Sequence, residues 1–195
     1  MSDTVEAAAT EAEEPTRRDF IHLLAAGTAA MGGVGVVVPL VAQMAPDASV
    51  RALSSKEVDI SAIEIGQAIK VFWQGKPVFI RRRTAEEIEL AKETPLNALK
   101  DKVARNDNLS GAVGAEDANR VVKDEWLVVT GVCTHLGCIP LGTAQGEVKG
   151  DYSGWFCPCH GSHYDTSGRI RKGPAPENLP VPPYQFVNDT TIKIG

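Results

Sequence analysis

The longest apolar segment of the chain lies near its N-terminus. From Leu23 to Ala42 there are 20 consecutive residues without a charge, and they show neither a polar face nor an amphipathic period. A helix of that length rises about 30 Å, enough to cross the hydrocarbon core of a bilayer. We therefore predict a single transmembrane anchor over residues 20–45 rather than a buried helix of a soluble domain.

Further along the chain the pattern changes to short apolar runs separated by Gly, Pro, Asn and Asp, which is typical of strands joined by turns. Trp126–Thr130 is a run of the buried-strand type, and Ile69–Trp73 and Pro77–Arg81 flank a short turn as a hairpin would. Further strands are predicted at 58–65, 154–156, 163–165, 169–171, 184–187 and 191–194. The prediction is a mainly β, antiparallel domain over residues 57–195.

Three segments stand outside the strand pattern. Thr84 is followed three residues on by Glu87, a capping-box pattern that predicts the start of a helix. Residues 95–120 are rich in Asn, Asp, Gly and Ala, and we expect them to form an inserted surface excursion. Residues 46–56 are mostly small and polar, and their place between the anchor and the domain predicts a flexible tether.

The charge of the chain is unevenly distributed. The 195 residues carry a formal net charge of −5. Residues 1–45 hold 2 basic and 6 acidic residues, whereas the remaining residues hold 18 basic and 19 acidic ones. The domain is therefore nearly neutral and has no basic stripe, which argues against a nucleic-acid partner. A mean hydropathy of −0.11 with 43% hydrophobic residues excludes a polytopic membrane protein and a wholly disordered chain.

The residues before the apolar segment resemble a twin-arginine export signal. Arg17 and Arg18 precede the bulky pair Phe20-Ile21 at the start of the hydrophobic run. The alternative is that the two arginines act only as positive charges on the inner side of the membrane. Both interpretations leave residues 1–19 as a cytoplasmic tail and place the domain outside. The end of the segment matches a cleavage site poorly, so we expect an anchor that is not removed.

The cysteines lie among the histidines in two short loops. All four cysteines fall within 27 residues, and three of the four histidines are interleaved with or adjacent to them. One loop reads Cys133-Thr134-His135-Leu136-Gly137-Cys138, and the other reads Cys157-Pro158-Cys159-His160-Gly161-Ser162. Thiols scattered through a core would not produce this repetition of Cys with His. The two loops are therefore the candidate site.

Three kinds of site use these residue types. A structural zinc could take one Cys and one His from each loop, but it leaves two cysteines unexplained. Two disulfides could staple an exported domain, in which case the histidines are incidental. A [2Fe–2S] cluster held by two thiolates and two imidazoles, with the other two cysteines paired, accounts for all six residues.

The two loops together resemble the double motif of Rieske iron–sulfur proteins, and in particular that of the iron–sulfur subunits of cytochrome bc1 complexes. The resemblance covers essentially the whole chain, from the tail and single anchor to the Gly-Pro-Ala-Pro sequence at 173–176. It implies a Rieske-type antiparallel β domain whose cluster-binding subdomain spans about 131–176. It also implies one [2Fe–2S] cluster of the Cys₂His₂ type.

Carried over by position, the resemblance implies two cysteines on an inner iron and two histidines on an outer one, namely Cys133, Cys157, His135 and His160. It further implies a disulfide between Cys138 and Cys159 that ties the loops together. Hydroxyls that donate to a bridging sulfide and to a cysteine sulfur are expected at Ser162 and Tyr164. Such hydrogen bonds stabilise the reduced cluster and raise its potential.

Other residues near the loops receive different roles. The resemblance implies shielding and docking residues at Leu136, Gly173, Pro174, Ala175 and Pro176. His163 matches no ligand position, and we expect an ordinary surface histidine.

The resemblance implies electron transfer coupled to proton transfer. His160, with His135 as a second exposed candidate, would contact ubiquinol at cytochrome b and accept its proton. The head would then swing on its tether to cytochrome c1. The chain would be one redox subunit of a dimeric quinol–cytochrome c reductase, not a catalyst alone. It would sit in a bacterial inner membrane with its head in the periplasm.

Two other redox roles remain open from the residues. One is the small subunit of an arsenite oxidase, which shares export signals and the six-residue pattern. The other is a Rieske ferredoxin that supplies a ring-hydroxylating oxygenase. Such ferredoxins typically lack the two additional cysteines and the anchor, so Cys138 and Cys159 argue against that role.

Overall fold

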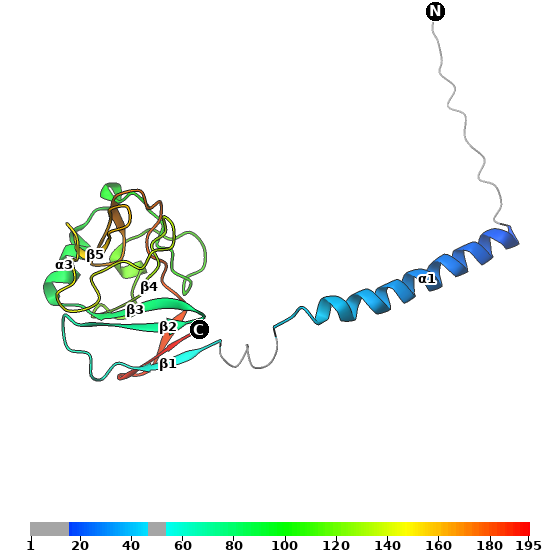
Figure 1. Ribbon diagram of the computed structural model, residues 1–195, viewed down its shortest axis with the longest axis horizontal. Coiled ribbons are helices and arrows are strands. Elements are labelled where there is room, and N and C mark those ends of the chain that lie inside the picture. The colour runs from blue at the N-terminus through cyan, green and yellow to red at the C-terminus, as the bar shows by residue number, and fades with distance from the viewer. Residues whose placement is uncertain (1–15, 47–53) are drawn as a thin grey trace, which may run out of the picture. The chain divides into compact units, whose positions relative to one another are not determined.

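The computed structural model describes residues 16–46 and 54–195. They belong to two compact units, an N-terminal helix and a C-terminal head (Figure 1). Helix α1 (Arg17–Ala42) is the one helix in these residues that is long and apolar enough to cross a membrane. The predicted apolar helix is therefore confirmed. The inserted Pro39 does not end it.

Helix α1 begins three residues before the predicted anchor. The Thr16 hydroxyl accepts the Asp19 N–H at 3.3 Å, and the Asp19 carboxylate accepts the Thr16 N–H at 2.8 Å. This capping box satisfies backbone donors that a helix start leaves unpaired. Arg17 and Arg18 consequently lie in the first turn of the helix and not in a preceding coil.

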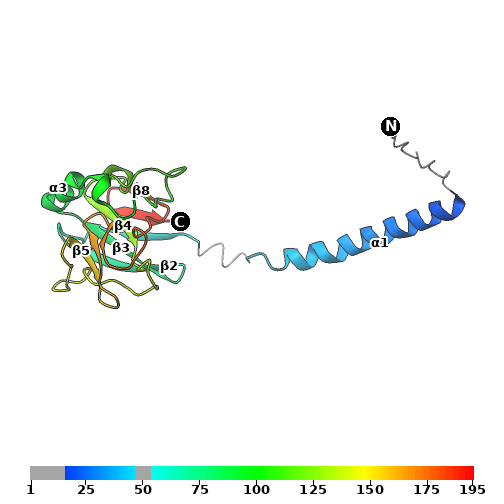
Figure 2. The same ribbon diagram turned by 90° about the horizontal axis from the view of Figure 1, so that it is seen from above.

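The head consists of three antiparallel three-stranded sheets, with strand orders β1-β9-β8, β2-β3-β4 and β5-β6-β7 (Figures 1 and 2). The strands are β1 (Lys56–Asp59), β2 (Ala68–Trp73), β3 (Lys76–Arg82), β4 (Trp126–Thr130), β5 (Ser153–Cys157), β6 (Ser162–Asp165), β7 (Ile170–Lys172), β8 (Tyr184–Asn188) and β9 (Thr191–Ile194). The helices are α3 (Ala85–Glu93), with the predicted capping box at Thr84 and Glu87, and the 3₁₀ turns η1 (Leu96–Ala98) and η2 (Asp117–Asn119). The mainly β, antiparallel prediction is confirmed.

The β2–β3 hairpin turns at Gln74 and Gly75. Both residues have positive φ, 49° and 75°, as a two-residue type I′ turn requires. The turn sets Trp73 opposite Lys76 and fixes the register of the strands. β3 in turn pairs with β4, so the two strands with the most buried residues lie side by side.

The core joins this sheet to the sheet that carries the second cysteine loop. Phe79 of β3 and Trp155 of β5 are both fully buried, and their rings stack with centroids 6.0 Å apart. Gly131, which leads from β4 into the first loop, passes directly over the Phe79 ring, where a Cβ would lie 2.3 Å from a ring carbon. The core thus sets the position of both loops.

The expected strand over 58–65 is shorter than predicted. β1 ends at Asp59, because its carboxylate accepts the Ser61 N–H at 2.8 Å and starts a turn. Ile60 and Ile63 remain buried at 1% and 3% exposure. Ile65, the last apolar residue of the predicted strand, is 65% exposed. The apolar alternation therefore predicted the burial of Ile60 and Ile63 correctly, but neither the burial of Ile65 nor the length of the strand.

The prediction of a surface excursion at 95–120 holds for residues 107–112, which are all exposed, and was wrong for the parts on either side of them. Buried residues lie in two parts of the segment, 99–104 and 115–120, namely Leu99, Asp101, Ala104, Ala115, Asp117 and Arg120. Arg120 is fully buried and donates to the carbonyls of Ser167 and Leu179 at 2.7 Å each, and to that of Ala104. Polar groups hold the segment against the head, so it shows no apolar period.

The predicted tether lies mostly outside the described residues. Of residues 46–56, the structure describes Pro46 and residues 54–56, and Lys56 already belongs to β1. The indole of Trp73 donates to the Ser54 carbonyl at 2.7 Å. Ser54, at the end of the predicted tether, is therefore already in contact with the head.

Candidate metal centre

The two cysteine loops have a closely similar backbone. In the first, Gly137 N–H donates to Cys133 O at 2.9 Å, and in the second Gly161 N–H donates to Cys157 O at 3.0 Å. Gly137 and Gly161 have φ values of 83° and 72°, which glycine adopts without strain. The repeated Cys and His of the sequence are therefore presented by two equivalent tight loops.

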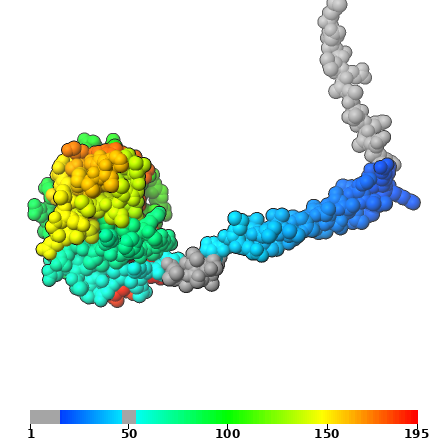
Figure 3. Space-filling view, viewed as in Figure 1, coloured from blue at the N-terminus to red at the C-terminus, as the bar shows by residue number. Residues whose placement is uncertain are grey.

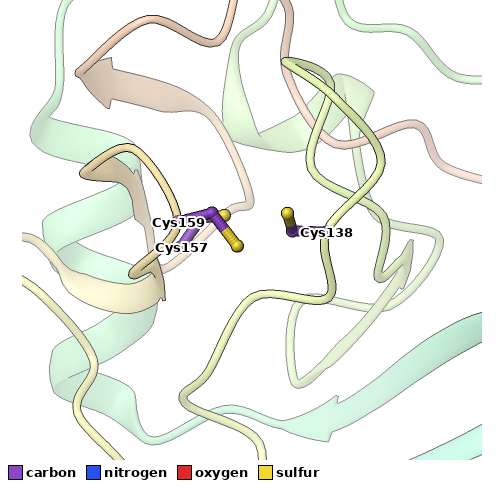
Figure 4. Close-up of side chains that lie close together, drawn as sticks. All are labelled: Cys138, Cys157 and Cys159. Carbon is purple, nitrogen blue, oxygen red and sulfur yellow. The ribbon is translucent and has the colours of Figure 1, made fainter.

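These loops lie at the end of the head away from β1 and the C-terminus. Figure 3 shows the colours of residues 140–175 gathered there, opposite the cyan and red of β1 and β9. Figure 4 shows Cys138 facing Cys157 and Cys159 from the opposing loop. The sulfurs of these three residues lie within 4.8 Å of one another. All four cysteines are free thiols in this structure.

The candidate ligands divide into a buried pair and an outer pair. Cys133 and Cys157 are both 2% exposed. Burial, and next the neighbouring Cys133, raises the pKa of the Cys157 thiol to about 12. Two buried thiolates side by side need a cation close by, and a metal that replaces their protons provides it.

The outer pair consists of the imidazoles of His135 and His160. Their ring centroids lie 4.6 Å apart and their planes are nearly perpendicular. Nδ1 of His135 is buried and has no hydrogen-bond partner in residues 16–46 and 54–195. Buried polar atoms are normally paired, so this nitrogen is suited to a ligand. His160 is exposed.

The Tyr164 hydroxyl lies against one of the two buried sulfurs, that of Cys133, as expected. Its oxygen donates to Cys133 Sγ at 3.3 Å and accepts the Thr134 N–H at 3.3 Å. Burial raises the pKa of Tyr164, with the nearby Cys133 adding to the shift. The phenol therefore keeps its proton and remains a donor at neutral pH.

Ser162 lies at the base of the second loop, opposite Cys157 in the β5–β6 pair. It is 1% exposed, and its hydroxyl oxygen accepts the Ala175 N–H at 3.2 Å. Ala175 belongs to the Gly-Pro-Ala-Pro segment (residues 173–176), which thus packs against the second loop.

The tip of the first loop is apolar and exposed. Leu136 is 71% exposed, as expected for a residue that shields the site or meets a partner, and Ile139 is 44% exposed. Sequence reasoning missed Ile139 as part of this surface. It also missed Thr134, whose hydroxyl donates to the Glu177 carbonyl at 2.7 Å and ties the first loop to the segment after Pro176. Its place inside the motif was the only signal for that role.

The expectation of a surface histidine at 163 was wrong. The His163 side chain is 12% exposed, and its Nδ1 accepts the Asp151 N–H at 3.1 Å. The ring packs beside Phe156, with centroids 4.8 Å apart. His163 therefore supports β5 and β6 from the side and is not one of the loop histidines.

The donor set fits a [2Fe–2S] group. Two buried thiols and two outer imidazoles, one of them with an unpaired nitrogen, match a cluster with thiolates on one iron and imidazoles on the other. A hydroxyl already directed at a ligand sulfur supplies the outer support that tunes such a site.

The comparisons with known proteins agree with this donor set. A family model described as the Rieske [2Fe-2S] domain matches residues 95–184. The head is therefore a Rieske [2Fe–2S] domain, and its cofactor is a Rieske cluster. A second family model, described as the Ubiquitinol-cytochrome C reductase Fe-S subunit TAT signal, matches residues 7–47.

Full-length relatives identify the family. The chain is 52% identical over 198 residues to the ubiquinol-cytochrome c reductase iron-sulfur subunit of Rhodospirillum rubrum, with 100% of both chains covered. It is 53% identical over 182 residues to that of Cereibacter sphaeroides, covering 92% of this chain and 95% of the relative. A solved structure entitled Hyperthermophilic respiratory Complex III aligns with a TM-score of 0.49 and 26% identity, over 88% of this chain and 98% of that one. The chain belongs to the family of ubiquinol–cytochrome c reductase iron–sulfur subunits.

This membership decides between the interpretations of the six loop residues. The zinc and plain-disulfide interpretations are wrong, since the domain is of the [2Fe–2S] type. The same membership decides against the arsenite-oxidase and ferredoxin roles, since the chain is a subunit of a quinol–cytochrome c oxidoreductase.

Proposed function

We propose that this chain takes one electron from ubiquinol at cytochrome b and passes it to cytochrome c1, and that His160 receives the accompanying proton. The observation that carries the proposal is the division of the ligand candidates into buried thiols and an exposed imidazole. This arrangement keeps the sulfurs from water while a ring nitrogen reaches the surface. The chain supplies one redox site and needs its partner subunits for turnover.

Four side chains would hold the cluster. Cys133 and Cys157 would bind the inner iron, and His135 and His160 the outer one. A cluster held by these residues would supply a one-electron acceptor, and its reduction would make the imidazoles of His135 and His160 more basic.

The exposed imidazole of His160 is the group that contacts quinol and accepts its proton. His160 accepts a hydrogen bond from the quinol hydroxyl and holds the transferred proton at its outward ring nitrogen. His135 is less exposed, so it is the second choice for this contact. Leu136 and Ile139 are exposed apolar side chains of the same loop region as His135. When the head docks on cytochrome b, they would exclude water from around the two histidines.

We infer a disulfide between Cys138 and Cys159. Their sulfurs lie within 4.8 Å and come from the two separate loops. An exported head meets an oxidising compartment in which such a bond persists. Peptide mapping of the full chain without reductant tests it, and the expected product is one peptide pair linked through these two residues.

The proposed location is a bacterial inner membrane, with the N-terminus in the cytoplasm and the head in the periplasm. The match of residues 7–47 to a TAT-signal model and the apolar helix α1 support it. Replacement of Arg17 and Arg18 by Lys should leave the folded head in the cytoplasm. A head still delivered to the periplasm would contradict use of the twin-arginine route.

We propose that the head moves between its partner subunits, and the position of the site in the head supports this proposal. The cysteine loops occupy the end of the head away from β1, where the chain enters it (Figure 3). A rotation about that entry displaces the site more than any other part of the head. Prolines placed in residues 47–53 should slow turnover and leave the cluster spectrum intact. Full activity with a stiffened segment would contradict the swinging head.

Complementation tests the proposed function directly. Membranes from a strain that lacks this chain should regain inhibitor-sensitive ubiquinol–cytochrome c reduction when the chain is restored. Cys133→Ser should abolish both the cluster signal and the activity. Restoration of activity by Cys133→Ser would contradict the ligand assignment. No activity from the parent chain, with cytochromes b and c1 present, would contradict the partners proposed.

A further inference from the structure

A lysine far along the chain reaches the segment that packs against the second loop. Lys100 Nζ donates to the carbonyl of Gly173 at 2.9 Å and to that of Ala175 at 2.8 Å. Lys100 comes from the 95–120 segment, 73 residues before the first of these acceptors. One ammonium therefore holds two carbonyls of the Gly-Pro-Ala-Pro segment in place.

That segment is in direct contact with the second loop. A Cβ on Gly173 would lie 2.3 Å from Gly161 O and 2.6 Å from the Cα of Ser162, so the two backbones meet without a side chain between them. The backbone of Ala175 links Lys100 and Ser162: the Ala175 carbonyl accepts from Lys100, and the Ala175 N–H donates to Ser162 Oγ at 3.2 Å.

The Ala175 N–H determines what the Ser162 hydroxyl can do. With its oxygen occupied as an acceptor, the hydroxyl directs its own proton elsewhere. Ser162 is 1% exposed, and its hydroxyl donates to no acceptor within the described residues. The free donor therefore lies inside the site, across the strand pair from Cys157.

We propose that Lys100 is a positioning residue for the iron–sulfur site: through the backbone of Ala175 it holds the Ser162 hydroxyl as a donor to the reduced cluster and so raises the midpoint potential. The inference rests on the proposed function for the cluster at this site. A donor held in place stabilises the extra negative charge of the reduced state. If the Gly-Pro-Ala-Pro segment is held less firmly, the reduced state loses part of that stabilisation.

The chain around Lys100 is held by other contacts, so a variant at this position should fold. Leu99 is 4% exposed. The Asp101 carboxylate accepts the Asn178 N–H at 3.0 Å, and the Asn178 amide donates to Asp101 O at 3.0 Å. Lys102 provides a matched control, because it is exposed and its side chain makes no hydrogen bond or ion pair within residues 16–46 and 54–195.

A redox titration of the full-length, cluster-loaded chain in membranes, followed by EPR, tests the proposal. Lys100→Met should lower the midpoint potential, with the reduction equilibrium shifted by roughly threefold or more. Lys100→Arg, which keeps the donors, should stay close to the parent, and Lys102→Met should not shift. In a Ser162→Ala background, Lys100→Met should add little, because both changes remove the same donor.

Each contrary outcome has a distinct meaning. An unchanged potential in Lys100→Met would overturn the proposal. An equal shift in Lys102→Met would show an effect of charge alone, and full additivity with Ser162→Ala would show that Ser162 is not the route. Both would overturn it too. A parent chain without a high-potential signal would contradict the proposed function itself, and this inference with it.

Discussion

The phenol oxygen of Tyr164 lies 3.3 Å from Cys133 Sγ, although the two residues are 31 positions apart in the chain. The contact crosses from β6 to the first cysteine loop. Because Tyr164 is fully buried, the hydroxyl has no water with which to exchange this bond. It is therefore a fixed donor to a sulfur that we assign to the inner iron.

Tyr164→Phe removes this donor and leaves the ring in place. A hydrogen bond to a charged acceptor favours the reduced, more negative state, so its loss should lower the midpoint potential. The expected shift is about tenfold in the reduction equilibrium, or about 59 mV for one electron. A redox titration measures it. An unchanged potential with a fully loaded cluster would remove Tyr164 from the tuning role.

Ser162→Ala should also lower the midpoint potential without loss of the cluster. The hydroxyl is buried and carries a free donor inside the site. Its removal costs one hydrogen bond to the reduced state and no ligand. The same titration checks this, with the metal content of the variant as the control for cluster retention. Loss of metal along with the hydroxyl would instead make Ser162 a structural residue.

Asp117→Ala should destabilise the head strongly. Asp117 accepts two hydrogen bonds from Arg83, at 2.6 and 3.0 Å, and one from the Ser167 hydroxyl at 2.6 Å. Both members of the ion pair are buried, with side-chain exposures of 0% and 1%. Removal of Asp117 leaves the buried guanidinium of Arg83 without its opposite charge, which lowers the free energy of unfolding by about 3–5 kcal/mol. Urea unfolding measures it.

The exposed pair of Lys92 and Asp124 is the matched control for that experiment. Its atoms are 2.6 Å apart, but the two side chains are 52% and 55% exposed. Asp124→Ala should cost less than about 1 kcal/mol. Equal losses in the two variants would show that burial does not set the strength of these ion pairs.

Glu87 should make stability depend on acid pH. Burial is the largest single influence and would raise its pKa, but Arg81, the Thr84 N–H and Lys149 together outweigh burial and hold the pKa below its ordinary value. A carboxylate whose pKa is lower in the folded protein stabilises the fold at pH values above its pKa in the unfolded chain, about 4.3. That stabilisation is lost as the pH falls through the pKa of the folded protein.

Glu87→Gln should therefore be less stable than the parent at pH 7, by about 3 kcal/mol for a broken buried pair. The difference between the two should shrink as the pH drops below about 4.3. Urea unfolding at several pH values measures it, with the exposed neighbour in Glu86→Gln as the control. A difference that stays constant down to pH 3 would contradict the ionised pair.

The sequence predicted those parts of the fold that depend on local patterns. The β2–β3 hairpin and β4 came from apolar runs flanking turn residues, and α3 came from the capping pair Thr84 and Glu87. The 95–120 segment could not be predicted in this way. It is held by groups such as Arg120, which binds the carbonyls of Ser167 and Leu179 at the far end of the sequence.

The candidate site shows the same division. The ligand candidates share two short motifs, so the sequence alone predicted that the two loops meet. The contacts of Thr134 and Lys100 each join a side chain to a backbone carbonyl more than 40 residues away. A carbonyl acceptor is present at every position, so it leaves no mark on the sequence by which its partner can be found.

EPR of isolated membranes, reduced first with ascorbate and then with dithionite, tests the central claim most directly. We predict a rhombic [2Fe–2S] signal that appears with ascorbate alone and changes when a quinol-site inhibitor is added. A signal that needs dithionite would contradict a high-potential centre that oxidises quinol. With the chain present and loaded with metal, no signal under either reductant would contradict the cluster itself.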